Sequence, residues 1–224
     1  MPAVNQATNL QLTLYGSPVS TFVCKVQLLL EYKSVPYRIE MPDRETLLQL
    51  NPLGKIPVLR DGNNVVVDSS VICDYLDRRF PQWPVYPVDP YARSQALWLE
   101  EYADSALQEC FYPFVREALF NPKLYGQPTD IAVMEQARAD ASDRLDYLER
   151  VLDGNFLVGG LLSIADLTLA AVLINPLQVG FLLDAGRWPK LSAYIKNLFA
   201  REPFASRIKQ SQKAIEEIKA RRPD

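Results

Sequence analysis

Two short segments place hydroxyl groups where a strand is expected to lead into a helix. Gly16–Ser20 follows alternating apolar and polar residues, Asp68-Ser69-Ser70 follows a short apolar run, and a helical pattern begins after each segment. The first N–H groups of a helix lack partners within it and carry a partial positive charge. A hydroxyl at that position can therefore help to bind an anion in front of the helix. The alternative at both segments is a hydroxyl that only caps its own helix.

A third segment, Leu53–Val58, places a proline at the start of an apolar run. Proline cannot donate a hydrogen bond within a sheet, so Pro57 is unusual at the start of a buried strand. A cis peptide bond between Ile56 and Pro57 would turn the backbone of Ile56 outward. An extended peptide could then pair with that backbone as an added strand does.

The composition excludes several kinds of chemistry. The 224 residues include no histidine, which excludes Ser-His-Asp hydrolysis and Cys-His proteolysis and nearly every zinc site, so we expect no metal. The three cysteines, Cys24, Cys73 and Cys110, form no CxxC pair and no disulfide framework, which favours a reducing cytoplasm. A net charge of −3 gives no support for nucleic-acid binding, and no apolar run is long enough to span a membrane. We therefore expect a cytoplasmic protein with neither nucleic acid nor membrane as a partner.

The first third of the chain has the pattern of a small α/β domain. Strands are predicted at 10–15, 36–41, 56–60 and 64–67, and helices at 21–34, 44–50 and 68–80. The β-α-β unit should place its two strands in parallel, and Asp61-Gly62-Asn63 should close an antiparallel hairpin. We therefore predict an α/β thioredoxin-like domain over residues 10–81, with four mixed strands and three helices.

The rest of the chain is predicted to be helical. Residues 81–90 carry four prolines and are typical of a semi-rigid linker. Helices are expected at 90–119, at 130–152, from residue 163, at 190–200 and at 204–221. The run Leu167–Ile174 is apolar on all sides apart from Thr168, which indicates a helix at the centre of a bundle. An all-α C-terminal domain is therefore predicted over residues 90–220.

Four motifs occur in an order that resembles the cytosolic glutathione transferases, and in particular serine-type, bacterial-like members. The motifs are Ser20 five residues before Lys25, the segment Asn51-Pro52-Leu53-Gly54-Lys55-Ile56-Pro57, the pair Asp68-Ser69, and the capping-box sequence Ser163-Ile164-Ala165-Asp166. The resemblance extends from Leu10 to about Ile218 and leaves the class within the family open. It implies a domain that binds glutathione and a helical domain that supplies the pocket for an electrophile.

The resemblance also implies roles for individual residues. Ser20 matches the catalytic serine, which donates a hydrogen bond to the sulfur of bound glutathione. Lys55 matches a position that often contacts the tripeptide, and Ile56 matches the residue whose backbone pairs with the cysteinyl part. Asp68 is directed to the amine of the γ-glutamyl end and Ser69 to its carboxylate. Other hydroxyls that could take the place of Ser20 are those of Tyr15, Ser17 and Thr21.

The long helix after residue 90 is expected to face the electrophile. Its candidate lining residues are Trp98, Tyr102, Phe111, Tyr112 and Phe114, with Arg116 as a candidate anchor. A mixed aromatic wall suits flat apolar molecules. Asp104 matches an acidic residue that, in some classes, reaches the site of a neighbouring subunit. Cys24, one helical turn after Ser20, is expected to be a buried structural cysteine.

These observations and the resemblance predict a glutathione transferase that acts on small hydrophobic electrophiles. Glutathione is the implied co-substrate and a homodimer the implied assembly. Two alternatives stay open: a glutathione-dependent peroxidase, reductase or isomerase on the same fold, and a non-catalytic interaction protein. The intact set of Ser20, Ile56-Pro57 and Asp68-Ser69 argues against the last, since a pure scaffold does not need a tripeptide site.

Overall fold

The N-terminal part of the protein is a four-stranded sheet with three helices. The structure, a computed structural model, describes residues 12–221. Its first elements are β1 (Leu12–Tyr15), α1 (Thr21–Tyr32), β2 (Arg38–Glu40), α2 (Arg44–Leu50), β3 (Val58–Asp61), β4 (Asn64–Val67) and α3 (Ser69–Arg79). Leu10 and Gln11, the start of the first predicted strand, lie outside the described residues.

The sheet has the strand order β2-β1-β3-β4. Strand β1 runs parallel to β2 and antiparallel to β3, and β3 runs antiparallel to β4. Leu14 of β1 lies opposite Leu59 of β3, and both are fully buried. The predicted thioredoxin-like arrangement of four mixed strands and three helices is therefore confirmed.

Helix α1 is buried along most of its length because it packs against both the sheet domain and the helical domain. Val23, Val26 and Leu29 are fully buried. In the loop before the helix, a Cβ on Gly16 would lie 2.3 Å from Cγ2 of Val23. Only a residue without a side chain lets the loop approach the helix so closely. Gly16 therefore helps to fix the path of the loop that leads to Ser20.

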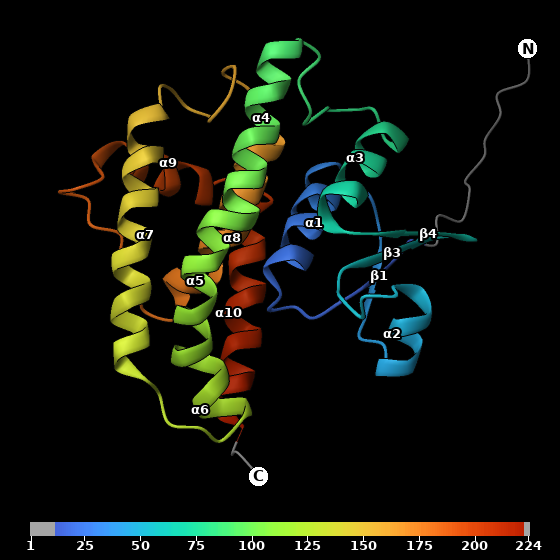
Figure 1. Ribbon diagram of the computed structural model, residues 1–224. Helices are drawn as coiled ribbons and strands as arrows, with labels where there is room; N and C mark the ends of the chain where they lie inside the picture. Colours follow the sequence, from blue (N-terminus) through green and yellow to red (C-terminus); the bar gives the residue numbers. More distant parts are fainter. Residues whose placement is uncertain (1–11, 222–224) are drawn as a thin grey trace, which may run out of the picture.

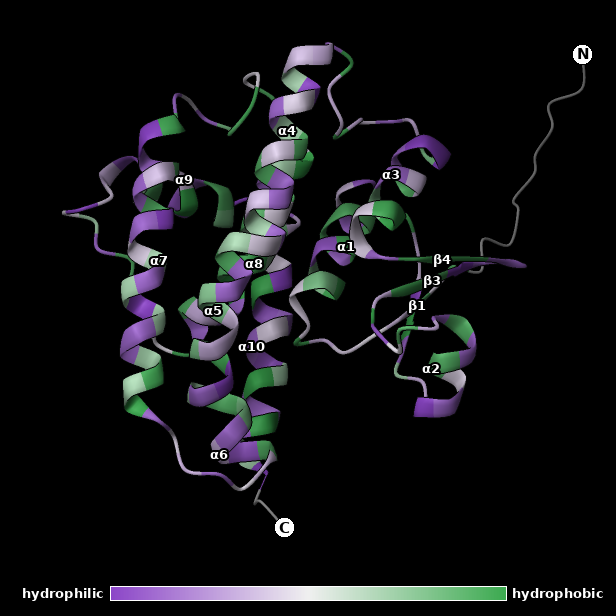
Figure 2. Ribbon diagram, viewed as in Figure 1, coloured by the Kyte–Doolittle hydropathy of each residue, from purple (hydrophilic) through white to green (hydrophobic). Residues whose placement is uncertain are grey.

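The elements that follow the proline-rich linker are all helical. They are α4 (Pro90–Tyr102), η1 (Ala103–Leu107), α5 (Gln108–Val115), η2 (Arg116–Phe120), α6 (Asn121–Leu124), α7 (Ile131–Val151), α8 (Ile164–Gln178), α9 (Pro189–Phe199) and α10 (Phe204–Ala220). Figure 1 shows this bundle on the left and the sheet on the right, with α1 between them. Hydrophilic and hydrophobic residues alternate along α7 (Figure 2), whereas α8 is buried from Ile164 to Pro176. Helix α8 is thus the buried centre of the bundle, as its apolar run predicts.

The helix predicted at 90–119 departs from regular α-helical geometry. The chain is helical from Pro90 to Leu124, but Ala103–Leu107 and Arg116–Phe120 form wider π-helical turns. A π-turn accommodates one extra residue, which a sequence pattern with a period of 3.6 does not reveal. The first of these turns carries Asp104, which lies at the site described below.

The start of α8 is fixed by the predicted capping box. Asp166 accepts hydrogen bonds from the N–H of Ser163 at 2.8 Å, the N–H of Leu157 at 2.9 Å and the hydroxyl of Tyr194 at 2.6 Å. Asp166 is fully buried, so these bonds replace the water that its carboxylate loses. The N–H of Ile164 donates to the carbonyl of Val85 at 2.9 Å and ties α8 to the linker.

Membrane-spanning helices and metal clusters are absent from residues 12–221. No helix in this range combines the length and the apolar character that crossing a membrane requires. The same residues contain no group of three or more histidine, cysteine, aspartate or glutamate side chains that could hold a metal ion.

Candidate functional site

Ser20 is the residue at which α1 begins. Its backbone is extended, with φ −80° and ψ 125°, and its hydroxyl oxygen accepts a hydrogen bond from the N–H of Val23 at 3.4 Å. An oxygen that accepts in this way keeps its own hydrogen to donate elsewhere. The partial positive charge of the helix end also favours an anion there. Capping and anion binding, the two interpretations of Ser20, are therefore compatible.

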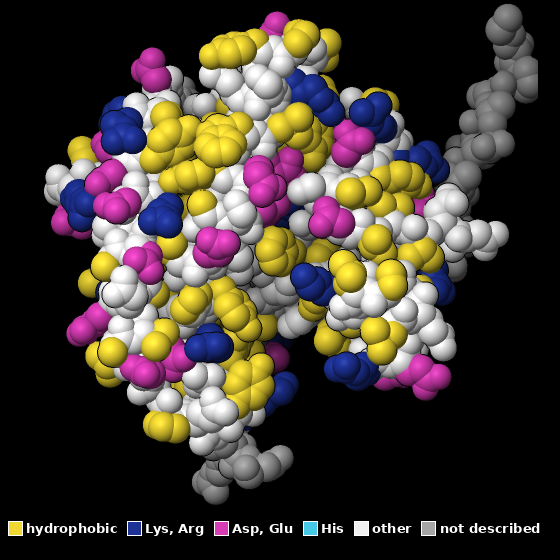
Figure 3. Space-filling model, in the orientation of Figure 1, with side chains coloured by type: hydrophobic (Ala, Val, Ile, Leu, Met, Phe, Trp, Pro, Cys, Tyr) yellow, Lys and Arg dark blue, Asp and Glu magenta, His cyan; other side chains and the backbone are white. Residues whose placement is uncertain are grey.

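Ser20 lines a cavity of about 550 Å³, which we call the apolar cavity. The cavity lies between the start of α1, the loop before β3, and helices α5, α6 and α8. Figure 3 shows a hollow between the two lobes, with hydrophobic side chains along its left edge. The apolar side chains that line the cavity include Phe22, Phe111, Tyr112, Val115, Phe120, Leu124, Tyr125, Val172 and Pro176.

The predicted aromatic wall is only partly present. Phe111 and Tyr112 line the apolar cavity, but Phe120, Leu124 and Tyr125 line it as well and are absent from the predicted set. These three residues lie at or beyond the second π-turn, where the helical pattern is interrupted. All three lie beyond residue 119, where the sequence predicts the helix to end, so the predicted wall does not include them.

The remaining predicted lining residues do not line the cavity: they are Trp98, Tyr102, Phe114 and Arg116. The indole N–H of Trp98 donates to the hydroxyl of Tyr147 on α7 at 2.8 Å. The guanidinium of Arg116 pairs with the neighbouring Glu117 at 3.1 Å. Residues along one helix face different sides, and these side chains face other helices or solvent.

A second cavity, of about 420 Å³, adjoins the first and shares Phe22, Lys55 and Ile56 with it. We call it the polar cavity because it is lined by Asn51, Asp68, Ser69, Ser70, Glu101, Asp104 and Ser105. Lys55, Ile56, Asp68 and Ser69 are thus brought together at one cavity, and Ser20 lies at the adjoining one.

The loop that carries Lys55 and Ile56 is held by Asn51, which follows α2. The Nδ2 atom of Asn51 donates to the carbonyl of Lys55 at 2.8 Å, and its Oδ1 atom accepts from the N–H of Leu53 at 3.0 Å. Asn51 is buried, and both of these bonds stay within the loop. The peptide bond between Ile56 and Pro57 is cis. The motif contains Asn51 without indicating that it holds the loop.

Asp68 has a backbone conformation that residues other than glycine rarely adopt, with φ 75° and ψ 133°. Such a conformation costs on the order of 1–3 kcal/mol and is found mainly at functional sites. The Oδ1 atom of Asp68 accepts from the N–H of Ser70 at 3.0 Å and of Val71 at 3.2 Å, which offsets part of this cost. This arrangement places Ser69 at the first position of α3, beside the polar cavity.

Two family models match the chain, one in each half. The N-terminal domain of glutathione S-transferase matches residues 14–84, and the C-terminal domain of glutathione S-transferase matches residues 102–202. The chain belongs to the cytosolic glutathione S-transferase family. Family membership supports a function that involves glutathione.

Individual relatives match this chain over nearly its full length. The stringent starvation protein A homolog of Coxiella burnetii is 27% identical over 212 residues, which are 92% of this chain and 96% of the relative. Glutathione S-transferase U7 of Arabidopsis thaliana is 29% identical over 222 residues, or 94% of this chain and 92% of the relative. A crystal structure of a glutathione transferase homolog from Drosophila mojavensis matches with a TM-score of 0.79 and 24% identity. The match covers 96% of this chain and 99% of the homolog's chain.

The other candidate hydroxyls of this chain differ in their access to the site. Tyr15 is 8% exposed, and its ring centroid lies 5.6 Å from the guanidinium of Arg60. Tyr15 lines neither cavity. Ser17 and Thr21 line the apolar cavity together with Ser20. Ser17 and Thr21 are therefore the hydroxyls that an experiment must distinguish from Ser20.

The cysteines of this chain are poor sources of a thiolate. Cys24 is buried, and burial raises the pKa of its thiol to about 12. Burial likewise raises the pKa of Cys73 and that of Cys110, and all three cysteines are free. Because the thiolate is the reactive form, a nucleophilic sulfur at this site would have to come from a ligand.

A buried ion cluster lies beside the polar cavity, and we call it the Lys25 cluster. The Nζ atom of Lys25 donates to Ser70 Oγ at 2.9 Å, to Glu100 Oε1 at 3.1 Å and to Asp104 Oδ2. The Lys25 side chain is only 1% exposed. Burial opposes its charge, but the carboxylates of Asp104 and Glu100 outweigh burial and hold the pKa of Lys25 above its ordinary value. Asp104 is thus bonded within its own chain.

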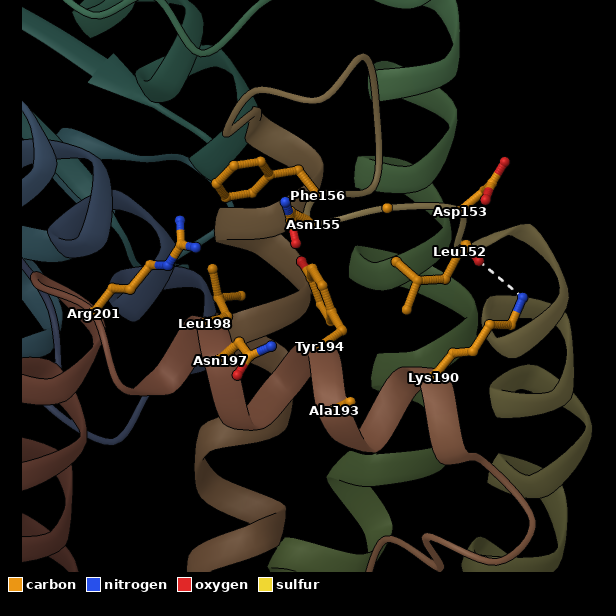
Figure 4. A pocket seen from close by; sticks show the side chains of 11 residues that line it. Leu152, Asp153, Asn155, Phe156, Lys190, Ala193, Tyr194, Asn197, Leu198 and Arg201 are labelled. Atoms are coloured by element: carbon orange, nitrogen blue, oxygen red, sulfur yellow. Dashed lines mark hydrogen bonds between the residues drawn. The ribbon is translucent and has the colours of Figure 1, made fainter.

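A further cavity, of about 250 Å³, lies beside α9 and away from the predicted residues. Figure 4 shows Lys190 reaching the carbonyl of Leu152, at 2.9 Å. The guanidinium of Arg201 lies 5.2 Å from the ring centroid of Phe156. These contacts stay within the helical domain, and this cavity shares no lining residue with the apolar or polar cavity.

Proposed function

We propose that this chain is a glutathione transferase that binds glutathione in the polar cavity and uses Ser20 to favour the thiolate form of its thiol. The observation that carries the proposal is that the two cavities adjoin at Lys55 and Ile56, with Ser20 on the apolar side and Ser69 on the polar side. Glutathione in the polar cavity would bring the sulfur of its central cysteine residue to this junction. The crystal structure of the Drosophila mojavensis homolog has bound glutathione, which supports the same ligand.

The groups around the polar cavity suit the two ends of the γ-glutamyl residue. The carboxylates of Asp68 and Asp104 favour its ammonium group, and Oδ1 of Asp104 is buried without a hydrogen-bond partner among residues 12–221. The start of α3, with Ser69, favours its carboxylate. The backbone of Ile56 can pair with the cysteinyl part as a neighbouring strand does, and Lys55 adds a positive charge.

The reaction follows from thiol chemistry. A free thiol has a pKa near 8.5, so only a few per cent is ionised at neutral pH. A hydrogen bond donated by Ser20 and the N-terminal end of α1 both favour the negative charge on sulfur and so lower this pKa. The thiolate attacks the electrophilic carbon, the leaving group departs with the bonding electrons, and the thiol proton passes to solvent. Ser20 is a hydrogen-bond donor in this scheme and forms no covalent bond.

The electrophile would occupy the apolar cavity. Phe22, Phe111, Tyr112 and Tyr125 supply aromatic surface, which favours flat and apolar molecules. We therefore propose small hydrophobic electrophiles, such as aryl halides, as the substrate class. Members of the family typically dimerise, and we propose a homodimer, which light scattering of the purified protein tests.

Calorimetric titration with glutathione, followed by turnover assays, tests the proposed function. Conjugation of glutathione to an aryl halide is the expected result. Reduction of cumene hydroperoxide without conjugation would assign a glutathione-dependent peroxidase instead. Absence of binding at millimolar glutathione would favour a non-catalytic interaction protein. The match to a stringent starvation protein A homolog is the reason for testing this alternative.

Replacing Ser69 by alanine is expected to weaken glutathione binding by about ten-fold, since a hydrogen bond to a charged group contributes about 1.5 kcal/mol or more. The maximal rate at saturating glutathione should change little, because the contact is made before and during the reaction alike. Calorimetry and steady-state kinetics measure the two effects. Ser94→Ala is the matched control, because the Ser94 hydroxyl is exposed and bonds only the carbonyl of Tyr91 in its own helix, at 2.7 Å. Unchanged affinity in Ser69→Ala would contradict the assignment of Ser69.

A further inference from the structure

Asn175 is a buried amide on the otherwise largely apolar helix α8. Its Nδ2 atom donates to the carbonyl oxygen of Val19 at 2.8 Å, and its Oδ1 atom accepts from the hydroxyl of Ser211 on α10 at 2.9 Å. Asn175 is 6% exposed and Ser211 is 4% exposed. A carbonyl oxygen can only accept, so the group that faces Val19 must be the amide nitrogen, and Oδ1 must then face Ser211. The chemistry of the two partners thus sets the orientation of the amide.

The bond from Asn175 holds one side of the peptide unit between Val19 and Ser20. The other side of that unit, the N–H of Ser20, donates to the carbonyl of Ser17 at 3.1 Å. Because a peptide unit is planar, bonds at its oxygen and at its nitrogen fix the orientation of the whole plane. The backbone from which the Ser20 side chain projects is therefore held on both sides, and the N–H of Val23 holds the hydroxyl oxygen itself.

The other buried polar side chains of α8 serve the helical domain alone. The hydroxyl of Thr168 donates to the carbonyl of Ile164 in its own helix at 2.8 Å, and Asp166 forms the capping box. Only Asn175, among these buried polar residues of α8, bonds the thioredoxin-like domain. A buried amide is costly unless it is hydrogen-bonded, and an apolar side chain would suffice for packing α8 against α1. Asn175 also lines the apolar cavity, where its amide nitrogen is engaged by the carbonyl of Val19.

We propose that Asn175 is a positioning residue for Ser20: from the helical domain it holds the Val19–Ser20 peptide so that the serine hydroxyl meets the sulfur of bound glutathione. This inference rests on the proposed function. Asn175 acts through the loop, and Ser211 acts one step further back by orienting the amide. The position of the hydroxyl is thereby coupled to the packing of α8 and α10 against the thioredoxin-like domain.

Asn175→Ala is expected to lower the turnover number by about ten- to hundred-fold, the effect of a small misplacement of a reacting group. The affinity for glutathione should stay nearly unchanged, because the polar cavity is built from other elements. Ser211→Ala should give a smaller loss in the same direction, and it carries the test if Asn175→Ala does not fold. Thr168→Val is the control: it removes a buried polar group from α8 that lines neither the apolar nor the polar cavity, and it should leave the turnover number unchanged.

A double variant separates positioning of Ser20 from a general structural effect. If Asn175 acts through Ser20, adding Asn175→Ala to Ser20→Ala should cause no further loss of turnover beyond Ser20→Ala alone. A full additional loss in the double variant, or normal turnover in both Asn175→Ala and Ser211→Ala, would overturn the inference while leaving the proposed function intact. Normal turnover in Ser20→Ala, or absence of glutathione binding, would overturn the proposed catalytic role and this inference together.

Discussion

Replacing Ser20 by alanine is expected to lower the turnover of glutathione with an aryl halide by about ten- to thousand-fold, the range for loss of one preorganised donor. The reason is that the thiolate loses its hydrogen bond, so that a smaller fraction of bound glutathione is ionised at neutral pH. Binding of glutathione should be nearly unaffected, since the proposed contacts of Lys55, Ile56, Asp68 and Ser69 remain. Steady-state kinetics and calorimetry measure the two quantities separately.

The neighbouring hydroxyls provide the controls for Ser20. Tyr15→Phe, Ser17→Ala and Thr21→Val each remove one hydroxyl of comparable position and should retain most of the activity. Ser17 and Thr21 line the same cavity as Ser20, so they control for changes in its shape and polarity. A larger loss in any of these three variants than in Ser20→Ala would show that the sulfur is activated by a different hydroxyl.

Replacing Lys25 by methionine is expected to lower the free energy of unfolding by about 3–5 kcal/mol, the usual effect of removing one partner from a buried ion pair. Glu100 is 3% exposed and accepts from Lys25 at 3.1 Å, and Asp104 accepts from the same ammonium group. Without the cation, both carboxylates would be left buried and uncompensated. Urea unfolding of the wild type and the variant measures the difference.

Two further variants show whether charge, rather than packing, is responsible. Arg78→Met removes an exposed partner of Asp74 and should change stability little. A triple variant, Lys25→Met with Glu100→Gln and Asp104→Asn, removes all three charges and should recover part of the loss. Wild-type stability of Lys25→Met alone would show that the Lys25 cluster contributes little.

The direction in which folding shifts the pKa of Lys25 determines the pH at which stability should be measured. Its pKa in the folded protein lies above the ordinary value, so folding favours the protonated form. The resulting stabilisation is complete below the unfolded-state pKa of about 10.4 and is lost as the pH rises through the folded-state pKa. Measurements at neutral pH therefore detect the full contribution.

Much of the fold could be predicted because its signals are local. Alternation in the first strand, the apolar periodicity of α1 and the Ser163–Asp166 capping box each lie within a few neighbouring residues. Ser20 and Asp68-Ser69 could be proposed for the same reason, since a hydroxyl or carboxylate at a strand-to-helix junction is visible in the sequence.

The parts that could not be predicted depend on contacts between distant segments. Lys25 and Glu100 are 75 residues apart, and Val19 and Asn175 are 156 residues apart, so neither pair leaves a pattern along the chain. The chain stays helical to Leu124, beyond the predicted helix end at residue 119, which is why the sequence does not place Phe120 and Tyr125 at the apolar cavity. Asn175 is a single polar residue between the apolar Ile174 and Pro176, and its partner Val19 lies in the other domain.

The most direct measurement of the central claim is a titration of glutathione bound to the protein, followed by the ultraviolet absorbance of its thiolate. We expect the thiol of bound glutathione to ionise with a pKa about one to two units below the free value near 8.5, and Ser20→Ala to move this pKa back toward the free value. A bound thiol that titrates at the free value in the wild-type protein would show that the site does not activate the sulfur.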